Sequence, residues 1–447
     1  MPKLTVVKIL KIKVFMKKRV LIVVGLMITL IQTIPAQKMM TLKECYEKAM
    51  SVNPLSGEKA AYSEIWQLKD KNLSRGWLPS LDANGSFIYN SSVVDMSSAL
   101  GSLPVPGIAD AIKPLPHKQY KITVDINQVI YDGGAIKSAR ALEEAELMLN
   151  EKQNETDLYK IRSQINSYYF NILLLSRQKE LLQNYLDLIN KRIKSMQSAL
   201  NNGILLKTDI DVIASEKIKL EQQLNENNTR KASFLKILSE LTGAEIEGSA
   251  EFVLPANGGE LTNDLARPEL DLFDIRINQL DANLRLVESR RMPKAFGFAT
   301  LGYGNPPGSN FFKDEFAPYY MLGAGVKWNI FDWNKAKNDK QVIALQQGII
   351  ENKKTDLSDN LKRLLEVKSS EISSLKSLLD TDTELITLRK RITATAESQY
   401  ENGTITVTDY MNELNSERQA LINYEIHKVN LSMAEVEYLN ISGKEIE

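Results

Sequence analysis

Gln128-Val-Ile-Tyr-Asp-Gly-Gly134 returns 200 positions later (328 − 128) as Trp328-Asn-Ile-Phe-Asp-Trp-Asn334. In both places an alternating segment ends at an aspartate, and a long stretch without proline follows. At the same offset, Asn202-Gly203 and Thr208-Asp209 return as Asn402-Gly403 and Thr408-Asp409. The chain therefore contains one plan twice: helix, two strands, very long helix, return helix. Each half is expected to be incomplete alone. We place the repeats at residues 37–257 and 258–447.

The composition offers few residues for metal binding or catalysis. Lys plus Arg equals Asp plus Glu at 56 each, so the net charge of zero removes the electrostatic argument for nucleic-acid binding. An apolar content of 43% argues against wholesale disorder. Two histidines and one cysteine cannot build a zinc cluster or a disulfide framework. We therefore expect no metal, no cofactor and no enzymatic activity.

The N-terminus has the pattern of an export signal. Lys17-Lys18-Arg19 precede the apolar run from Val20 to Ile34, and Ala36 offers a small residue for cleavage. The run is shorter than the roughly 20 residues of a membrane-spanning helix. We predict a signal peptide over residues 1–36. Cys45 lies well past this run and is interpreted as a semi-buried helical thiol rather than a lipid anchor.

The long helices carry a coiled-coil pattern. From residue 134 to 202 the chain has no proline or further glycine, which predicts a helix about 100 Å long. Its partner spans 334–402, and return helices are expected over 208–241 and 408–440. Apolar residues step by three and four from Leu158 to Leu200, with only Lys179 polar in the series. Taken alone, this pattern also fits an ordinary coiled coil.

Four segments alternate with the period of a β-strand, at about 80–90, 119–131, 294–304 and 319–331. Their lengths suit tilted transmembrane strands, although a soluble, half-buried sandwich shows the same alternation. Open sheet edges cannot exist in lipid, and a wide barrel needs about 12 strands, so three copies of four strands are expected. The residues predicted to face lipid are Tyr120, Ile122, Val124, Ile126, Tyr320, Leu322, Val326, Trp328 and Ile330.

The order of these elements resembles the TolC family of outer-membrane efflux channels, over roughly residues 41–443. Tyr400-x-x-Gly403-Thr404-x-x-x-x-Asp409 is the most family-like stretch. The resemblance implies an α+β membrane protein, a trimeric 12-stranded transmembrane β-barrel continued by a long antiparallel α-helical coiled-coil barrel. It implies a passive exit duct in the outer membrane of a Gram-negative bacterium, with its helices in the periplasm. The implied partners are a periplasmic adaptor protein and an inner-membrane transporter.

The resemblance also places a gate at the helical tip. Asp409 matches the first of two family aspartates that form acidic rings, whereas the second position is Asn412. Ile405 replaces a basic residue, so closure is expected to depend on Tyr400, Asp209 and apolar contact. From the sequence, Thr208 and Thr408 are candidate N-caps, with Thr208 and Asp211 forming a capping box. The candidate gate residues are Asp409, Asn412, Asp209, Asp211 and Tyr400, and the candidate adaptor-docking tips are Asn202, Gly203, Ile204, Asn402, Gly403 and Thr404.

A periplasmic coiled-coil adaptor is the main competing interpretation. Such a protein also has a signal peptide and a helical hairpin. It has a single hairpin, however, and soluble β domains in place of two strand pairs with aromatic ends.

Overall fold

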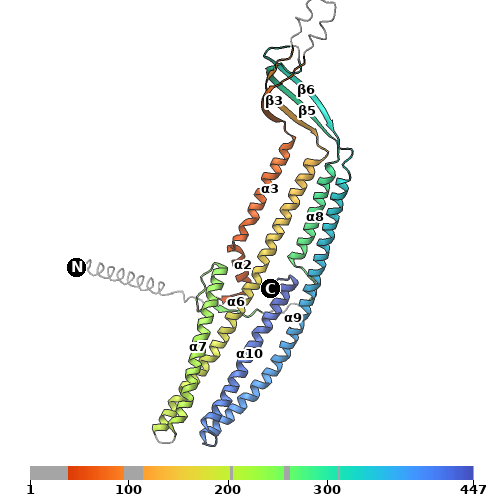
Figure 1. The fold of residues 1–447 in the computed structure, drawn as a ribbon. Helices are drawn as coiled ribbons and strands as arrows, with labels where there is room; N and C mark the ends of the chain where they lie inside the picture. Colours follow the sequence, from red (N-terminus) through yellow and green to blue (C-terminus); the bar gives the residue numbers. More distant parts are fainter. Residues whose placement is uncertain (1–38, 95–113, 202–204, 256–261, 311–312, 446–447) are drawn as a thin grey trace, which may run out of the picture.

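The computed structural model describes residues 39–94, 114–201, 205–255, 262–310 and 313–445. The predicted signal peptide, residues 1–36, lies outside these ranges. So do the candidate tip residues Asn202, Gly203 and Ile204, and the predicted boundary between the repeats at 257/258. The described chain is elongated, with a β-sheet at one end and two helical tips at the other (Figure 1).

The sheet has four antiparallel strands in the order β2-β3-β5-β6. They are β2 (Ser80–Tyr89), β3 (Lys118–Tyr131), β5 (Lys294–Asn305) and β6 (Ala317–Lys327). The central pair β3–β5 joins the two repeats. The fourth strand ends at Lys327 rather than near 331, because its partner β5 begins at Lys294, directly opposite Lys327.

Two helices of equal length form the body: α6 (Ala135–Asn201) and α9 (Lys335–Glu401), each of 67 residues. Each turns back into a return helix, α7 (Lys207–Thr242) or α10 (Val407–Ser442). The first helix is interrupted at Asn53-Pro54, because proline cannot continue a helix, and divides into α2 (Leu42–Val52), a 3₁₀ turn (Pro54–Gly57) and α3 (Glu58–Ser74). The counterpart of this first helix in the second repeat is α8 (Pro268–Ser289).

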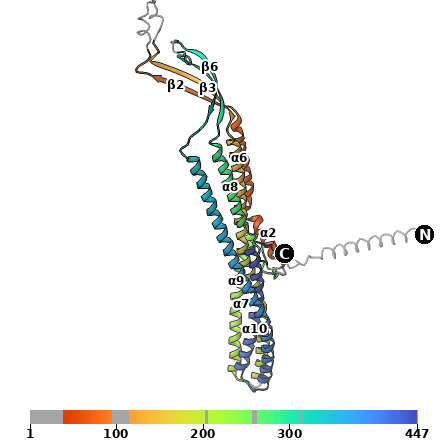
Figure 2. The same ribbon diagram turned by 90° about the vertical axis from the view of Figure 1, so that its right-hand side faces the viewer.

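The helices lie side by side in one layer (Figures 1 and 2). Near the sheet the order is α3-α6-α8-α9, and near the tips it is α7-α6-α10-α9. Both near the sheet and near the tips, α6 is therefore an internal helix and α9 an edge helix. Three buried apolar clusters hold the layer together, and the one nearest the tips combines residues of α6, α7, α9 and α10.

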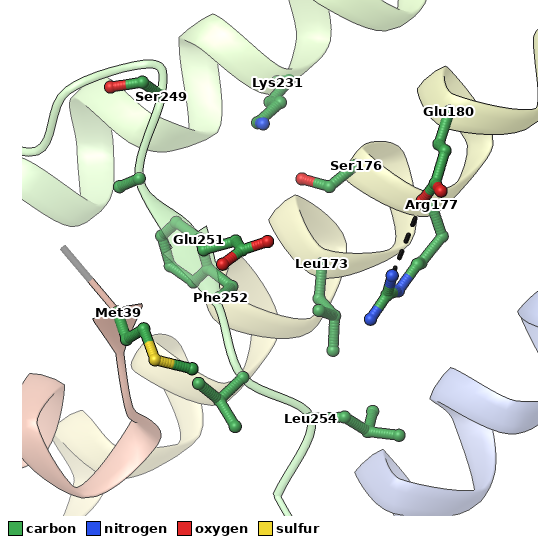
Figure 3. A pocket seen from close by; sticks show the side chains of 12 residues that line it. Met39, Leu173, Ser176, Arg177, Glu180, Lys231, Ser249, Glu251, Phe252 and Leu254 are labelled. Carbon is green, nitrogen blue, oxygen red and sulfur yellow. Dashed lines mark ion pairs between the residues drawn. The ribbon is translucent and has the colours of Figure 1, made fainter. Parts of the chain in front are cut away.

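A small parallel pair, β1 (Met39–Met40) with β4 (Glu251–Phe252), crosses the helices at mid-length. The buried Tyr169 hydroxyl lies 2.8 Å from the Met40 carbonyl oxygen and 2.6 Å from that of Val253, so it can donate to either. Beside the pair, Lys231 and Leu173 line a depression between α6 and α7 (Figure 3). Cys45 of α2 is fully buried, more than the semi-buried position that the sequence predicts. The alternation rule does not find such two-residue strands.

Candidate functional site

The turn between α9 and α10 positions the best-defined tip. Gly403 adopts φ +70°, a left-handed conformation that costs glycine little, and its N–H donates to the Tyr400 carbonyl (3.0 Å). The Thr404 N–H donates to the Gln399 carbonyl (2.9 Å), and the Asn402 N–H donates to the Ser398 carbonyl (3.1 Å). Asn402, Gly403 and Thr404 are consequently exposed at the end of the molecule.

The predicted caps are wrong by two residues. The helices begin at Lys207 and Val407, so Leu206 and Thr406 are the N-caps, because these residues have the extended backbone that precedes the first free N–H groups. The Asp409 N–H donates to Thr406 Oγ1 (3.2 Å), and the Thr406 N–H and hydroxyl donate to Asp409 Oδ2 (3.1 and 2.7 Å). These bonds lower the pKa of the Asp409 carboxyl.

The first hairpin has half of this arrangement. The Leu206 N–H donates to Asp209 Oδ2 (3.1 Å), but leucine has no side-chain acceptor to return the bond. The predicted capping box of Thr208 and Asp211 is therefore wrong: the carboxylate that accepts from the N-cap N–H is that of Asp209, and Asp211 is exposed on α7. Of the three tip aspartates that the sequence singled out, Asp209 and Asp409 accept hydrogen bonds from the N-caps of their helices.

Tyr400 packs inside the tip rather than projecting from it. Its ring stacks on Tyr410 with centroids 5.6 Å apart and planes 12° apart. Burial, and after it the nearby Asp209 carboxylate, raises the pKa of Tyr400. Asp209 of the first hairpin therefore lies close to Tyr400 of the second. The role of Tyr400 and Asp209 in closure stays a prediction.

Asp409 and Asn412 lie on one face of the second hairpin. They line a shallow groove of about 410 Å³ together with Ile405, Gln399 and Arg391. The structure thus brings the two ring-position residues together with the isoleucine that replaces the basic residue.

Two arginines that sequence reasoning missed connect the hairpins. Arg192 of α6 pairs with Glu397 and Glu401 of α9, the second at 3.2 Å, and lies over the Tyr410 ring of α10. Arg418 of α10 pairs with Glu216 of α7 at 3.2 Å, with both side chains almost buried. The spacing of Glu397 and Glu401 by one helical turn is visible in the sequence, but a partner some 205 residues away is not.

The sheet presents an apolar outer face. Strand pairing places the predicted residues of β3 and β6 on the same side, with Val124 opposite Leu301 and Leu301 opposite Tyr320. Leu322 is 75% exposed and Val124 38% exposed. Trp328 and Ile330 are also exposed, but they follow the end of β6. The large side chains of this face include Leu81, Phe87, Tyr89, Tyr120, Ile122, Val124, Ile126, Leu301, Tyr303, Tyr320, Leu322 and Val326.

Aromatic rings border this face at both ends. Tyr120 contacts Phe87 (centroids 4.9 Å apart) and Phe316 (5.8 Å), and Phe316 stacks on Tyr303. At the helix end, Phe331 packs on Trp333 (4.8 Å), and the Trp328 indole donates to the Arg291 carbonyl (3.1 Å). In the described part of the chain, no helix combines the length and apolarity needed to cross a membrane.

The chain is similar to known proteins in part of its sequence and in its fold. Residues 73–243 match the family described as outer membrane efflux protein. The outer membrane protein VceC of Vibrio cholerae is 13% identical, with 91% of this chain and 97% of that chain covered and a TM-score of 0.66. The Campylobacter jejuni CmeC outer membrane channel (14%; 90% and 85% covered; 0.64) and the open Neisseria gonorrhoeae MtrE channel (14%; 91% and 89%; 0.64) are similar. No curated protein matches the sequence.

The resemblance to the TolC family is thereby confirmed, in sequence over residues 73–243 and in fold over nine-tenths of the chain. The competing interpretation as an adaptor predicted one helical hairpin. The structure has two, α6–α7 and α9–α10.

Proposed function

We propose that this outer membrane efflux protein homologue is the outer-membrane exit duct of a tripartite efflux or secretion system. One observation carries the proposal: a sheet with an exposed apolar face and aromatic borders continues directly into helices about 100 Å long. An exposed apolar band between aromatic girdles suits lipid contact. The helical length suits a tunnel that crosses the periplasm.

The duct is proposed to be a homotrimer. Within the described residues, β2 and β6 are the free edges of a four-stranded sheet, and free edges are not tolerated in lipid. Three copies supply 12 strands, enough to close a barrel around a passage. The four predicted lipid-facing residues of β3, with Tyr320, Leu322 and Val326 of β6, then form part of the outer wall of the barrel.

The helical edges support the same assembly. α9, at one edge, exposes an apolar stripe to solvent in the single chain. At the opposite edge, Ile65 and Leu68 of α3 and Ile218 of α7 are also exposed. A second copy placed edge to edge covers both sets, which a lone chain leaves in water. The members of the α9 stripe are Val342, Leu345, Ile349, Leu364, Val367, Leu378, Leu385, Leu388 and Ile392.

The tips are proposed to form the gate and the docking surface. Three copies of Asp409, with Asn412 one helical turn away, would surround the narrow end, while Asp209, Asp211 and Tyr400 complete its wall. The exposed turn Asn402–Thr404 and the predicted docking residues Asn202, Gly203 and Ile204 would contact a periplasmic adaptor that is itself bound to an inner-membrane transporter. The duct is passive and performs no chemistry.

Mass measurement of the protein extracted in a mild detergent tests the assembly. Three copies per particle are expected, together with ion currents after insertion into a planar lipid bilayer. A monodisperse monomer that retains its β-structure and conducts no ions would contradict the proposed duct.

A further inference from the structure

The face of β5 and β6 opposite the apolar outer face carries a row of large apolar side chains. Strand pairing places Phe296, Phe298, Met321 and Tyr319 on this second face, in that order away from the helices. We call these four residues, three aromatic rings and one methionine, the aromatic ladder. Phe298 is 38% exposed and Met321 43% exposed. In the proposed duct this side faces the water-filled passage. Exposed apolar surface is unusual there and marks a site of interaction with a ligand or partner.

Glycines directly opposite the rings determine how the rings lie. Phe298 pairs with Gly323, Phe296 with Gly325, and Tyr319 with Gly302. A Cβ atom added to Gly325 would lie 2.6 Å from Phe296 Cζ, and one added to Gly302 would lie 2.6 Å from Tyr319 Cε1. A Cβ on Gly323 would also collide with the Phe298 ring. Each ring therefore lies across the neighbouring strand, which turns a ring face, rather than an edge, toward the passage.

The other half of this face has a different chemistry. On β2 and β3 it presents mainly polar side chains, and Asp125 is the centre of a network. The Asp125 carboxylate accepts from Asn84 (2.8 Å), Thr123 (2.9 Å) and Thr300 (2.6 Å). The polar residues of this half are Asp82, Asn84, Ser86, Lys121, Thr123, Asp125 and Asn127. Apolar and polar sectors thus divide the pore side of each chain.

We infer that the aromatic ladder is a binding track for planar aromatic compounds in transit, an inference that rests on the proposed duct. Flat ring faces stack on planar aromatic molecules, and the negative ring face also attracts organic cations. The two rings nearest the helices are close, with the Phe296 and Phe298 centroids 6.5 Å apart. A bound planar molecule is therefore expected to move directly between these two rings. Several weak sites in series allow entry and release, as conduction requires.

Single-channel recording in planar bilayers tests the track. Ethidium is the planar aromatic probe, tetraethylammonium is a non-aromatic cation of the same charge, and both are added on the sheet side so that the helical tip is not in their path. We expect ethidium to interrupt the current of the wild-type channel for longer than tetraethylammonium does. In Phe298→Leu these interruptions should shorten about two- to tenfold, the contribution of one aromatic pair.

Two further variants separate binding from folding. Phe298→Tyr retains a ring and should retain the long interruptions. Gly323→Ala leaves Phe298 in place but displaces its ring, and should shorten them as Phe298→Leu does. Leu322→Ala, on the outer face, is the matched control and should leave the duration of the ethidium interruptions unchanged.

The outcomes distinguish the two proposals. Currents in every variant, with ethidium interruptions that do not respond to Phe298→Leu or Gly323→Ala, overturn the aromatic track and leave the duct intact. A wild-type protein that conducts no ions overturns the duct and the track with it.

Discussion

The two long helices α6 and α9 have the same length and the same buried seam, but only one is enclosed by its own chain. Ile172 and Ile372, at equivalent positions, are 0% and 3% exposed. Away from the seam they differ: where α9 has the exposed Leu364, Val367 and Leu378, α6 has the polar residues Gln164, Ser167 and Gln178. A duplicated sequence has thus produced an internal helix and an edge helix. In the proposed trimer, the edge formed by α9 is the surface that the next subunit covers.

The largest predicted effect separates the seam from the stripe. Ile172→Ala should lower the free energy of unfolding of the helical body by about 2–5 kcal/mol, because it leaves a cavity in a fully buried site. Val367→Ser with Leu378→Gln gives α9 the polar residue types of α6 at matched positions. This double variant should leave the unfolding energy of the isolated chain nearly unchanged and lower the temperature at which trimers dissociate. Circular dichroism during denaturation and native electrophoresis measure the two effects. A double variant whose trimers are as stable as wild type would exclude the stripe from the subunit interface.

The second prediction compares a central strand with an edge strand. Val124→Arg on β3 should destabilise the inserted protein by about 2–4 kcal/mol if this position lies near the bilayer midplane. Val326→Arg, one residue before the end of β6, should cost about 0–1 kcal/mol because it lies near an interface. Thr123→Arg, on the pore side, is the control and should be tolerated. Unfolding from lipid vesicles in denaturant gives these energies, and equal costs at Val124 and Thr123 would show that the outer face has been assigned wrongly.

The third prediction concerns the unequal caps. Thr406→Ala should cost about 0.5–2 kcal/mol because it removes the hydroxyl that accepts from Asp409 N–H. Leu206→Ala removes no hydrogen bond and should change stability by less than about 0.5 kcal/mol. The pKa of Asp409 is lowered in the folded state, so its contribution is complete above the ordinary carboxyl pKa and is lost as the pH falls through the lowered value. The Thr406→Ala difference should therefore shrink on acidification below about pH 4. A difference that stays constant to pH 2 would contradict the role of the carboxylate.

The smallest effect should appear in ion selectivity. In the proposed trimer, three Asp409 carboxylates at the tip would attract cations, so Asp409→Asn should reduce the preference for cations and weaken block by a trivalent cation. Asp209→Asn should do so less, because Asp209 is partly buried whereas Asp409 is exposed. Reversal potentials in planar bilayers give both values. Identical selectivity in wild type and Asp409→Asn would leave Asp409 as a helix cap alone.

Local patterns were sufficient for the elements and their chemistry. The period of two in residues 120–126 placed a strand and its apolar side, and the step of three and four from Leu158 to Leu200 placed a seam. The Asn53-Pro54 interruption needed no tertiary information, because proline removes a backbone donor wherever it stands in a helix. Helix starts were less certain. Thr208 and Thr408 are good capping residues by type, but the chain caps at Leu206 and Thr406, where the backbone is extended.

The contacts that could not be predicted from the sequence are those between residues far apart along the chain. The periodicities determined that this protein has two matched hairpins and an amphipathic sheet, since burial of an apolar face is a local requirement that each residue either meets or does not. Only the tertiary structure decided that Arg192 meets Glu397 and Glu401, that Phe298 lies over Gly323, and that α9 rather than α6 is left at the edge. Such contacts depend on the register between segments tens or hundreds of residues apart. The periodicity of a single sequence does not identify that register, because many registers satisfy the same periodicity.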